Sequence, residues 1–461
     1  MQGVGAMKIH PSDNVEIHEN GHKYACRLIR KGENVVKYGF PIGHAAAEIH
    51  PGEWVHSHNL KTNLSGKLED ICYQPHFDVL PERMPEMFPG YQRSDGTVGI
   101  RNDIFIICTV GCIQRSAEKI AAATGAKTFA HPYGCSQLGD DLKITQLTLR
   151  GLALHPNAAG VLVLGLGCEN NHIAAFQAIL GDYDPERILF LNAQDTQDEV
   201  AEGIRLVRRL QKRAERETRV PVPISKLRVG LKCGGSDGFS GITANPLVGQ
   251  LCDRLCAAGG ACVLTEVPEM FGAETLLLER CANENIFQKA LAMIKNYREY
   301  FLRHGQPVSE NPSPGNKEGG ITTLEEKSLG CVQKGGRAII SDVLDYGDTV
   351  RKTGLSLLNG PGNDLVAITN LMAAGVHLIL FTTGRGTPAG TGVPTIKISS
   401  NSALAAKKAN WIDFDAGQAL FEKNLSQELF SYVLRVAGGE QTKNEQNQYE
   451  EIAIFKEGVT L

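Results

Sequence analysis

Two patterns of apolar and polar positions divide the N-terminal part of the chain. Residues 1–65 contain short runs in which apolar and polar side chains alternate, with Gly or Pro every few residues. Alternation with a period of two, together with frequent turn residues, predicts a small all-β module. Residues 66–95 are polar and rich in proline and show little periodicity, so they are predicted to form a linker that lies over the surface.

From residue 96 onward, apolar runs typical of buried strands alternate with stretches of helical spacing. The first series includes "IFIICTVGC" (104–112) and "AGVLVLGLGCENN" (159–171), and a second begins at "KLRVGLKCGGSDG" (226–238), after Pro221 and Pro223. Strands that alternate with helices imply a parallel sheet covered on both faces. The expected fold class is therefore α/β. The small β-module is followed by two Rossmann-like domains with mainly parallel sheets, over residues 96–222 and 223–461.

Two segments of the second series lack a clear period. Residues 305–336 are rich in Gly, Pro and polar residues, which predicts one long loop, and loops of this length are usually functional or disordered. Residues 440–449 are polar and are predicted to be mobile.

The composition narrows the protein class. A chain of 461 residues exceeds what one core can organise, and 42% apolar with 21% charged residues is typical of a soluble globular protein. The formal net charge of -4 argues against a nucleic-acid-binding surface. No apolar run approaches the roughly 18 residues of a membrane span. No secretory signal is visible, so the 12 cysteines are expected to be reduced and the protein cytoplasmic.

Glycine beside a polar or thiol side chain follows nearly every predicted strand. Ligands of open parallel sheets bind at the carboxyl ends of the strands, and glycine lets the backbone approach a ligand closely. One such segment would be an ordinary turn between strand and helix, but six or seven together favour a ligand site. The polar and thiol side chains at these strand ends include Cys112, His131, Cys135, Cys168, Glu169, Asn170, Lys232, Cys233, Ser236, Asp237, Glu266, Glu269, Asn359, Asn363, Asp364 and Arg385.

The residue types at these strand ends indicate the kind of ligand. The chain has neither G-x-G-x-x-G nor G-x-x-x-x-G-K-[ST], so nucleotide binding has no support. Amide, hydroxyl and charged side chains suit a polyhydroxylated, anionic small molecule, because each hydroxyl needs a partner once it is desolvated. Lys232 and Arg385 could hold its carboxylate.

Two closely spaced histidines stand out in "WVHSHNL" (54–60). In a strand, His56 and His58 would point to the same face, which is a spacing that a metal site can use. The alternative is a pair of solvated histidines at the end of a strand.

Several long motifs resemble the altronate/galactarate dehydratase family. They are "GYQRSDGTVGIRN" (90–102), "LGLGCENN" (164–171), "KCGGSDGFSGITANP" (232–246), "NPSPGNKEGGITTLEEKSLGCVQKGG" (311–336) and "FTTGRGTPAG" (381–390). The N-terminal module, with "GHKYA" and "VHSHNL", resembles the family's SAF-type domain of the β-clip kind. The resemblance covers almost the whole chain and is greater to altronate than to galactarate dehydratases.

The resemblance implies a hydro-lyase of hexuronate breakdown. Altronate would lose water to give 2-dehydro-3-deoxy-gluconate, with Fe(2+) or Mn(2+) as the expected metal and a homo-oligomer as the expected assembly. A second reading is a dehydratase of galactarate or of another aldarate or aldonate. A more remote one is a sugar-acid binding protein without catalysis, against which the strand-end thiols and the metal-type histidines argue.

The same resemblance suggests roles for particular residues. We hypothesise that His22, His56 and His58 bind the metal. The alternative is an iron–sulfur cluster, as in some hydro-lyases. Its candidate ligands are Cys112, Cys135, Cys168, Cys233 and Cys331. His131 is the first candidate for the general base and Glu169 the second, although His131 could equally be a hydrogen-bonded core residue.

Overall fold

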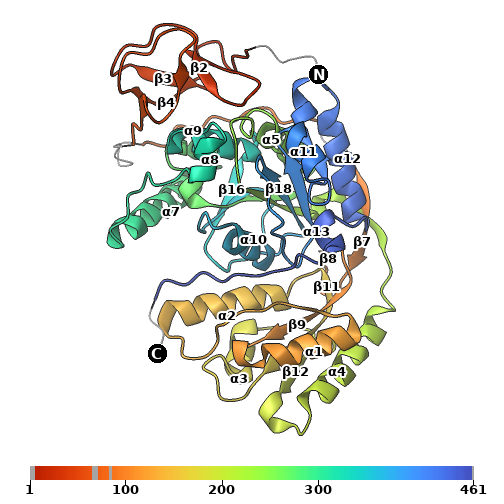
Figure 1. The fold of residues 1–461 in the computed structure, drawn as a ribbon. Coiled ribbons are helices and arrows are strands. Elements are labelled where there is room, and N and C mark those ends of the chain that lie inside the picture. Colours follow the sequence, from red (N-terminus) through yellow and green to blue (C-terminus); the bar gives the residue numbers. More distant parts are fainter. Residues whose placement is uncertain (1–5, 65–70, 83–85, 459–461) are drawn as a thin grey trace.

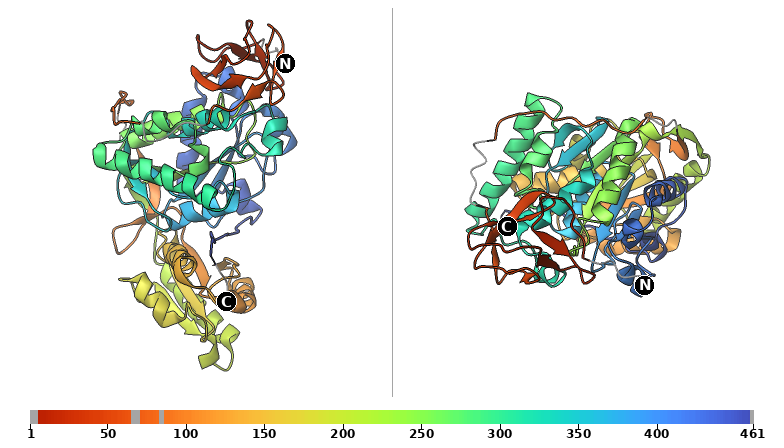
Figure 2. Two further views of the ribbon diagram at one scale, coloured as in Figure 1. Left: turned by 90° about the vertical axis from the view of Figure 1, so that its left-hand side faces the viewer. Right: turned by 90° about the horizontal axis from the view of Figure 1, so that it is seen from above.

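The computed structural model describes residues 6–64, 71–82 and 86–458. Figure 1 shows three parts in a row, with the N-terminal β-module at one end, a larger α/β domain in the middle and a smaller α/β domain at the other end. A second view, in Figure 2, shows the same order, with the β-module and the smaller domain on opposite sides of the larger one. No helix in these described ranges is long and apolar enough to cross a membrane.

The N-terminal module consists of two three-stranded antiparallel sheets. Alternate side chains along its strands are buried, and Ile29, Val35 and Ile42 are fully inaccessible. The predicted β-module is therefore confirmed. One sheet has the order β1 (Val15–Ile17), β2 (Lys23–Ala25), β5 (Trp54–Val55), and the other has the order β3 (Asn34–Lys37), β4 (Phe40–Ala45), β6 (Leu60–Lys61).

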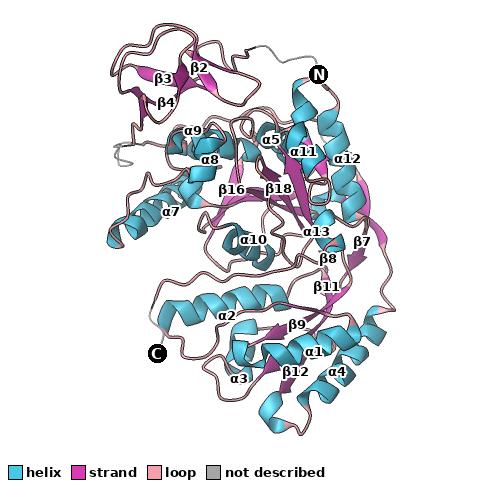
Figure 3. Cartoon of the chain, in the orientation of Figure 1, coloured by secondary structure: helices cyan, strands magenta, loops and turns pink. Residues whose placement is uncertain are grey.

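The smaller α/β domain is built on a four-stranded parallel sheet, which Figure 3 shows between helices. Its order is β10 (Lys127–Thr128), β9 (Asp103–Cys108), β11 (Ala158–Gly165), β12 (Ile188–Asn192). Helices α1 (Gln114–Thr124) and α4 (Glu199–Ala214) pack on one face, and α2 (Gly139–Ala153) and α3 (Ile173–Leu180) on the other. Every residue of β11 is buried, as expected of a central strand with both faces covered.

The larger α/β domain contains a seven-stranded parallel sheet. Its order is β16 (Ile340–Leu344), β17 (Gly354–Leu358), β15 (Ala261–Leu264), β14 (Arg228–Cys233), β18 (Leu378–Thr383), β19 (Thr395–Ser399), β20 (Phe414–Asp415). Helices α5 (Ala244–Ala257) and α12 (Leu425–Ala437) pack on one face, and α10 (Asp364–Ala373) on the other. Because α10 also packs against α2, the two domains share one hydrophobic cluster. The predicted fold class is confirmed.

The prediction of one long loop over residues 305–336 is wrong, because this segment contains helices. It contains α8 (Pro314–Glu318) and α9 (Leu324–Cys331), which begin after capping hydroxyls of Ser313 and Thr323. All eight residues of α9 are buried, so the helix has no polar face and leaves no amphipathic period in the sequence.

Two further predictions about irregular segments need correction. Within the predicted linker, residues 66–70 and 83–85 lie outside the described residues and 71–82 have no regular secondary structure, but β7 (Met87–Gln92) pairs with β13 (Val220–Pro223). The predicted mobile segment at 440–449 contains α13 (Lys443–Gln446), where the buried side chain of Asn444 accepts a hydrogen bond from the Thr395 amide.

Candidate active site

A cavity of ≈ 660 Å³ lies at the carboxyl edge of the seven-stranded sheet. This is where open parallel sheets bind ligands, and the volume suits a small molecule. Segments after β14, β15 and β18 meet there with α8, α9 and the start of α10. The polar residues of its lining are Cys233, Glu269, Asn311, Ser313, Asn316, Lys327, Asn363, Asp364 and Thr387.

A buried lysine forms the base of this site. Lys232, at the end of β14, is inaccessible to solvent, and its ammonium lies 2.5 Å from Glu266 Oε1 and 2.8 Å from Asp364 Oδ1. Although burial works against the charge, Glu266, Asp364 and Glu269 raise the pKa of Lys232, which keeps it protonated. A side chain on Gly234 would place its Cβ 2.6 Å from Asp364 Oδ1, so glycine is needed for this close approach.

Glu266 adopts an unusual conformation for its residue type. Its φ is +72°, in the left-handed region, and it lies two residues after the end of β15. Burial and the neighbouring Glu269 raise the pKa of Glu266, and its second carboxyl oxygen, Oε2, has no hydrogen-bond partner in the described structure. Strained backbone and unpaired buried polar atoms gather at functional sites, which supports placing the site here.

Two thiols and a carboxylate meet beside the lysine. Cys233 Sγ lies 3.3 Å from Cys331 Sγ and 3.1 Å from Glu269 Oε2. Lys334 Nζ donates to Cys233 Sγ at 2.8 Å, and Lys327 Nζ lies 2.9 Å from Glu269 Oε1. The hydrogen bond from Cys331 and the Lys334 ammonium lower the pKa of Cys233 to about 7 against the effect of burial.

This group has the composition of a metal site. The ligand atoms of Cys233, Glu269 and Cys331 all lie within 4.8 Å of one another, and all three residues are buried. Within the described ranges, one other group meets the same criterion, namely Cys252, Cys256 and Cys262. Thiolate and carboxylate donors together suit a divalent transition metal.

The predicted substrate ligands of the second domain have different surroundings. Lys232 lies under the cavity, and Ser236 is buried nearby with no hydrogen-bond partner for its hydroxyl in the described structure. Asp237 accepts hydrogen bonds from Ser240, Ser400 and Asn401, so it ties loops together. Arg385 pairs with Glu318 at 2.9 Å on the exposed side. The remaining candidate, Asn359, lines a different cavity.

The other strand-end candidates belong to the smaller domain, and none of them lines the cavity. His131 is buried, with Nε2 2.9 Å from the carbonyl of Cys108 and Nδ1 accepting from the amide of Tyr133 at 3.2 Å. Burial lowers the pKa of His131. Asn170 caps the neighbouring loop through the amide of Ser136 at 2.8 Å. Cys112, Cys135 and Cys168 are exposed at the same edge.

The carboxylate of Glu169 is also occupied. It accepts hydrogen bonds from Thr109 Oγ1 at 2.6 Å and from the amides of Leu166 at 3.0 Å and Gly167 at 2.6 Å. These donors outweigh burial and lower the pKa of Glu169. In this arrangement Glu169, like His131, orders the loops at the end of the four-stranded sheet.

The three histidines proposed as metal ligands gather around Trp54. The rings of His22 and His56 are 6.1 Å apart, and the Trp54 ring stacks on His56 at 4.7 Å and lies 5.3 Å from His58. His56 Nε2 is 2.9 Å from the carbonyl of Lys317, and His22 Nδ1 accepts from the Trp54 indole at 3.3 Å. His22, His56 and His58 do not form one of the groups with all ligand atoms within 4.8 Å.

The segments that follow the predicted strands contain Glu269 and Asp364, but they do not contain two other charged residues of the site, Lys327 and Lys334. In the structure, Glu269 ends a short 3-10 helix after β15, Asp364 starts α10, and Lys327 and Lys334 lie in or after α9. A signal for Lys327 does exist in the sequence. "LEEKSLGC" carries charges without an amphipathic period, and charged residues that are fully buried are nearly always paired.

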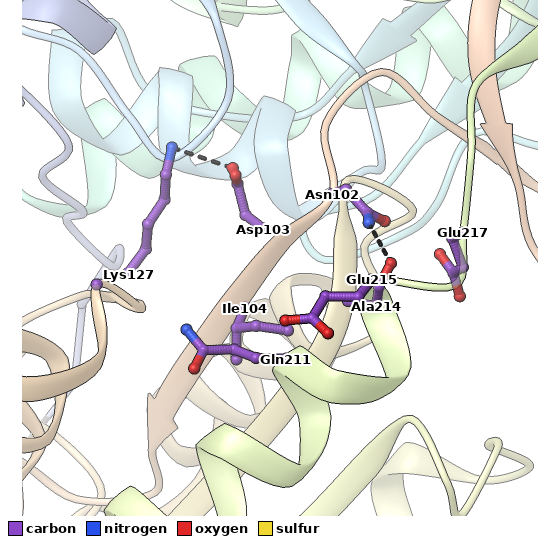
Figure 4. A pocket seen from close by; sticks show the side chains of 9 residues that line it. Asn102, Asp103, Ile104, Lys127, Gln211, Ala214, Glu215 and Glu217 are labelled. Carbon is purple, nitrogen blue, oxygen red and sulfur yellow. Dashed lines mark hydrogen bonds and ion pairs between the residues drawn. The ribbon is translucent and has the colours of Figure 1, made fainter.

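A further cavity of ≈ 510 Å³, shown in Figure 4, lies at the opposite edge of the smaller sheet. Its lining includes Asp103, the first residue of β9, and Lys127, which pairs with Asp103 at 3.1 Å and with Glu450 at 2.6 Å. Because strands begin rather than end at this edge, we assign it no ligand.

Comparison with known proteins relates the whole chain to one family. The model of the C-terminal part of D-galactarate/altronate dehydratases matches residues 224–460, that of the second domain of D-galactarate dehydratase/altronate hydrolase matches 90–215, and that of the altronate/galactarate dehydratase SAF domain matches 8–63.

Curated relatives agree with these matches. The chain is 51% identical to the altronate dehydratase of Escherichia coli (strain K12) and 49% identical to that of Bacillus subtilis (strain 168), in each case over 96% of this chain and 92% of the relative. It is 31% identical to the L-threo-forming galactarate dehydratase of E. coli, over 96% of this chain and 91% of the relative. The protein therefore belongs to the D-galactarate/altronate dehydratase family.

Proposed function

We propose that this protein is a hydro-lyase that removes water from D-altronate to give 2-dehydro-3-deoxy-D-gluconate. The observation that carries the substrate is the 51% and 49% identity to two altronate dehydratases, against 31% to a galactarate dehydratase. The reaction would take place in the cavity at the carboxyl edge of the larger sheet. The cytoplasmic location and the homo-oligomeric state remain predictions.

The cavity lining suits a sugar acid. Lys327 Nζ donates to Asn311 Oδ1 at 3.0 Å and to Asn316 Oδ1 at 3.2 Å, so one ammonium lies among amide groups on the wall. Amides and hydroxyls satisfy the hydroxyl groups of a desolvated polyol, and a cation stabilises a carboxylate.

Asp364 is the residue that we assign to take the proton from C2. It lines the cavity, and its side chain is 36% exposed, while one carboxylate oxygen is held by Lys232 at 2.8 Å. The other oxygen, Oδ2, has no hydrogen-bond partner among the described residues and can accept a proton. Loss of that proton and of the C3 hydroxide together make one water, so the same carboxyl group can return the proton to the departing oxygen. The resulting enol becomes the 2-oxo acid.

The donor set of Cys233, Glu269 and Cys331 fits a divalent cation. Two sulfur donors favour Fe(2+) over Mn(2+), which prefers oxygen ligands. Lys327 pairs with Glu269, and Lys334 donates to the sulfur of Cys233. When bound, the cation would stabilise negative charge that develops on the substrate carboxylate and polarise the C3 hydroxyl. The alternative ligands His22, His56 and His58 would require rearrangement around Trp54.

Iron binding can be measured apart from activity. Cys331→Ser removes one sulfur donor and is expected to weaken Fe(2+) binding on the order of 10-fold or more. The affinity is measured by titrating the chelator-treated protein with Fe(2+) under anaerobic conditions. Cys281→Ser, another buried thiol, is the matched control and should bind as the wild type does. Unchanged affinity in Cys331→Ser, with loss in His56→Ala, would move the metal to the histidines.

The substrate is tested with a panel of aldonates and aldarates. Formation of 2-oxo-3-deoxy acid is expected with the highest kcat/KM on D-altronate. Faster turnover of galactarate would transfer the proposal to that substrate. Binding of altronate without turnover by the iron-loaded protein would support the non-catalytic reading instead.

A further inference from the structure

Three Gly-Cys pairs follow three neighbouring strands of the smaller sheet. Cys112 comes after β9, Cys135 after β10 and Cys168 after β11, each directly behind a glycine. Since β9 lies between β10 and β11 and all three strands are parallel, the three loops lie at one edge of the sheet. We propose that Cys112, Cys135 and Cys168 bind an iron–sulfur cluster.

Backbone hydrogen bonds hold the three loops together. The amide of Gly111 donates to the carbonyl of Tyr133 at 2.9 Å, which joins the first loop to the second. The amide of Asn171 donates to the carbonyl of Gly134 at 3.0 Å, and its side chain donates to the carbonyl of Thr109 at 3.0 Å. The third loop is thus bonded to both of the others.

The glycines are required by this close approach. A Cβ on Gly134, whose φ is +100°, would lie 2.0 Å from the carbonyl oxygen of Thr109. A Cβ on Gly111 would lie 2.5 Å from the carbonyl oxygen of His131. A Cβ on Gly167, whose φ is +130°, would lie 2.6 Å from Gln194 Oε1. Each cysteine therefore follows a position that requires glycine. Contact with the neighbouring loop or side chain fixes where each cysteine lies.

Two buried polar residues reinforce the same loops. Glu169 joins the end of β9 to the third loop, because its carboxylate accepts from Thr109 Oγ1 and from the amide of Gly167. His131 bonds the second loop to the carbonyl of Cys108. The side chains that the sequence offers as acid–base candidates thus serve here to position three thiols.

The exposure of these thiols requires a functional reason. Cysteine is among the most buried residue types, and of the twelve cysteines only Cys72 and these three are exposed. Polar groups lie beside two of the sulfurs, with Gln194 Nε2 3.6 Å from Cys168 Sγ and Ser136 Oγ 3.8 Å from Cys135 Sγ. Hydrogen bonds to sulfur are among the means by which proteins tune a cluster.

A single metal ion would need the three sulfurs closer together than they lie in the described structure. A tetrahedral ion with metal–sulfur bonds of about 2.3 Å would hold its sulfurs about 3.8 Å apart. The three thiols do not form a group with all ligand atoms within 4.8 Å. A cubane cluster binds each cysteine through a different iron, so its ligands stand farther apart. Three cysteines would leave one iron of a [4Fe–4S] cluster without a protein ligand and open to an oxygen donor.

The test uses the full chain, purified without oxygen and then reconstituted with Fe(2+) and sulfide. We expect about four acid-labile sulfides per chain, with visible absorption from the cluster, in the wild type. Cys112→Ser, Cys135→Ser and Cys168→Ser should each lose most of the sulfide. Cys72→Ser, the other exposed thiol, is the matched control, and Cys233→Ser controls for the separate group in the larger domain. Both should retain the sulfide.

Either of two results would overturn the inference. One is a reconstituted wild type without acid-labile sulfide, and the other is sulfide that is unchanged in all three variants. Circular dichroism of each variant shows whether it remains folded. Turnover of D-altronate, measured on the same samples, keeps this inference separate from the proposed function. Activity in protein that binds no sulfide would contradict only the proposed cluster. Bound sulfide in protein without activity would contradict only the proposed reaction.

Discussion

Replacing Asp364 by asparagine is expected to lower kcat on D-altronate by about 10²–10⁴-fold, with little change in KM. This is the usual contribution of a positioned general base. Asparagine keeps the size of the side chain and can still accept a hydrogen bond from Lys232, which lies 2.8 Å from the carboxylate. It cannot take a proton. Because Lys232 also pairs with Glu266, the lysine keeps one carboxylate partner in the variant.

A second lysine–aspartate pair provides the control. Asp342 pairs with Lys352 at 3.0 Å on strand β16 and does not line the cavity, so Asp342→Asn should leave kcat and KM as they are. Steady-state kinetics under anaerobic conditions, with equilibrium binding of altronate to each variant, separate binding from chemistry. If Asp364→Asn turns over altronate within a few fold of the wild type, the proton goes to another group.

The rule that ligands bind at the carboxyl ends of parallel strands predicts part of this site from sequence. It selects Lys232 and Cys233 because both end a buried run, and the structure places both at the carboxyl edge of the larger sheet. The rule also selects Cys135 and Cys168, which end up at the edge of the other sheet. Apolar periodicity identifies strands but not the sheet to which each belongs, so the sequence alone predicts a single site from residues that lie at the edges of two sheets.

Other parts of the site depend on contacts between distant positions. Helix α9 supplies Glu326, Lys327 and Cys331, and none of its faces meets solvent. A fully enclosed helix has no polar stripe, and its charged residues are explained only by their partners. Glu326 bonds to Lys37, which is 289 positions earlier in the chain. An ion pair between residues so far apart in the sequence cannot be predicted from the local spacing of residues.

That pairing is how the β-module docks on the larger domain. Lys23 Nζ lies 2.8 Å and Lys37 Nζ 2.9 Å from the two carboxylate oxygens of Glu326, and all three side chains are at most 2% exposed. Thr322 adds hydrogen bonds from its amide at 2.8 Å and its hydroxyl at 2.7 Å. One glutamate thus faces two lysines, so the interface carries an excess of positive charge. Burial and Lys37 outweigh Glu326 and lower the pKa of Lys23 to about 8.

Glu326→Gln is expected to destabilise the protein by about 3–5 kcal/mol, because two buried ammonium groups lose their only carboxylate partner in the described structure. Lys23→Met is the matched control. It leaves a one-to-one pair of Lys37 and Glu326, so the variant should be as stable as the wild type at pH 7, or more stable. Chemical unfolding gives both free energies, and hydrogen exchange of the segments around Lys23 and Thr322 reports whether the β-module stays docked.

The titrations of Glu326 and Lys23 both make the stability rise with pH, but in different pH windows. Burial alone would raise the pKa of Glu326, but Lys23 and Lys37 hold it below its usual 4.5, so its contribution to stability is complete above pH 4.5 and is lost as the pH falls below that value. The pKa of Lys23 falls from 10.5 to about 8, so the unfolded chain binds the extra proton between these values and stability rises with pH across that window. The free energy of unfolding should rise less between about pH 8 and 10.5 in Lys23→Met than in the wild type, because the contribution of Lys23 is absent. An equal rise in both proteins, or a Glu326→Gln variant as stable as the wild type, would mean that apolar contacts alone hold the module in place.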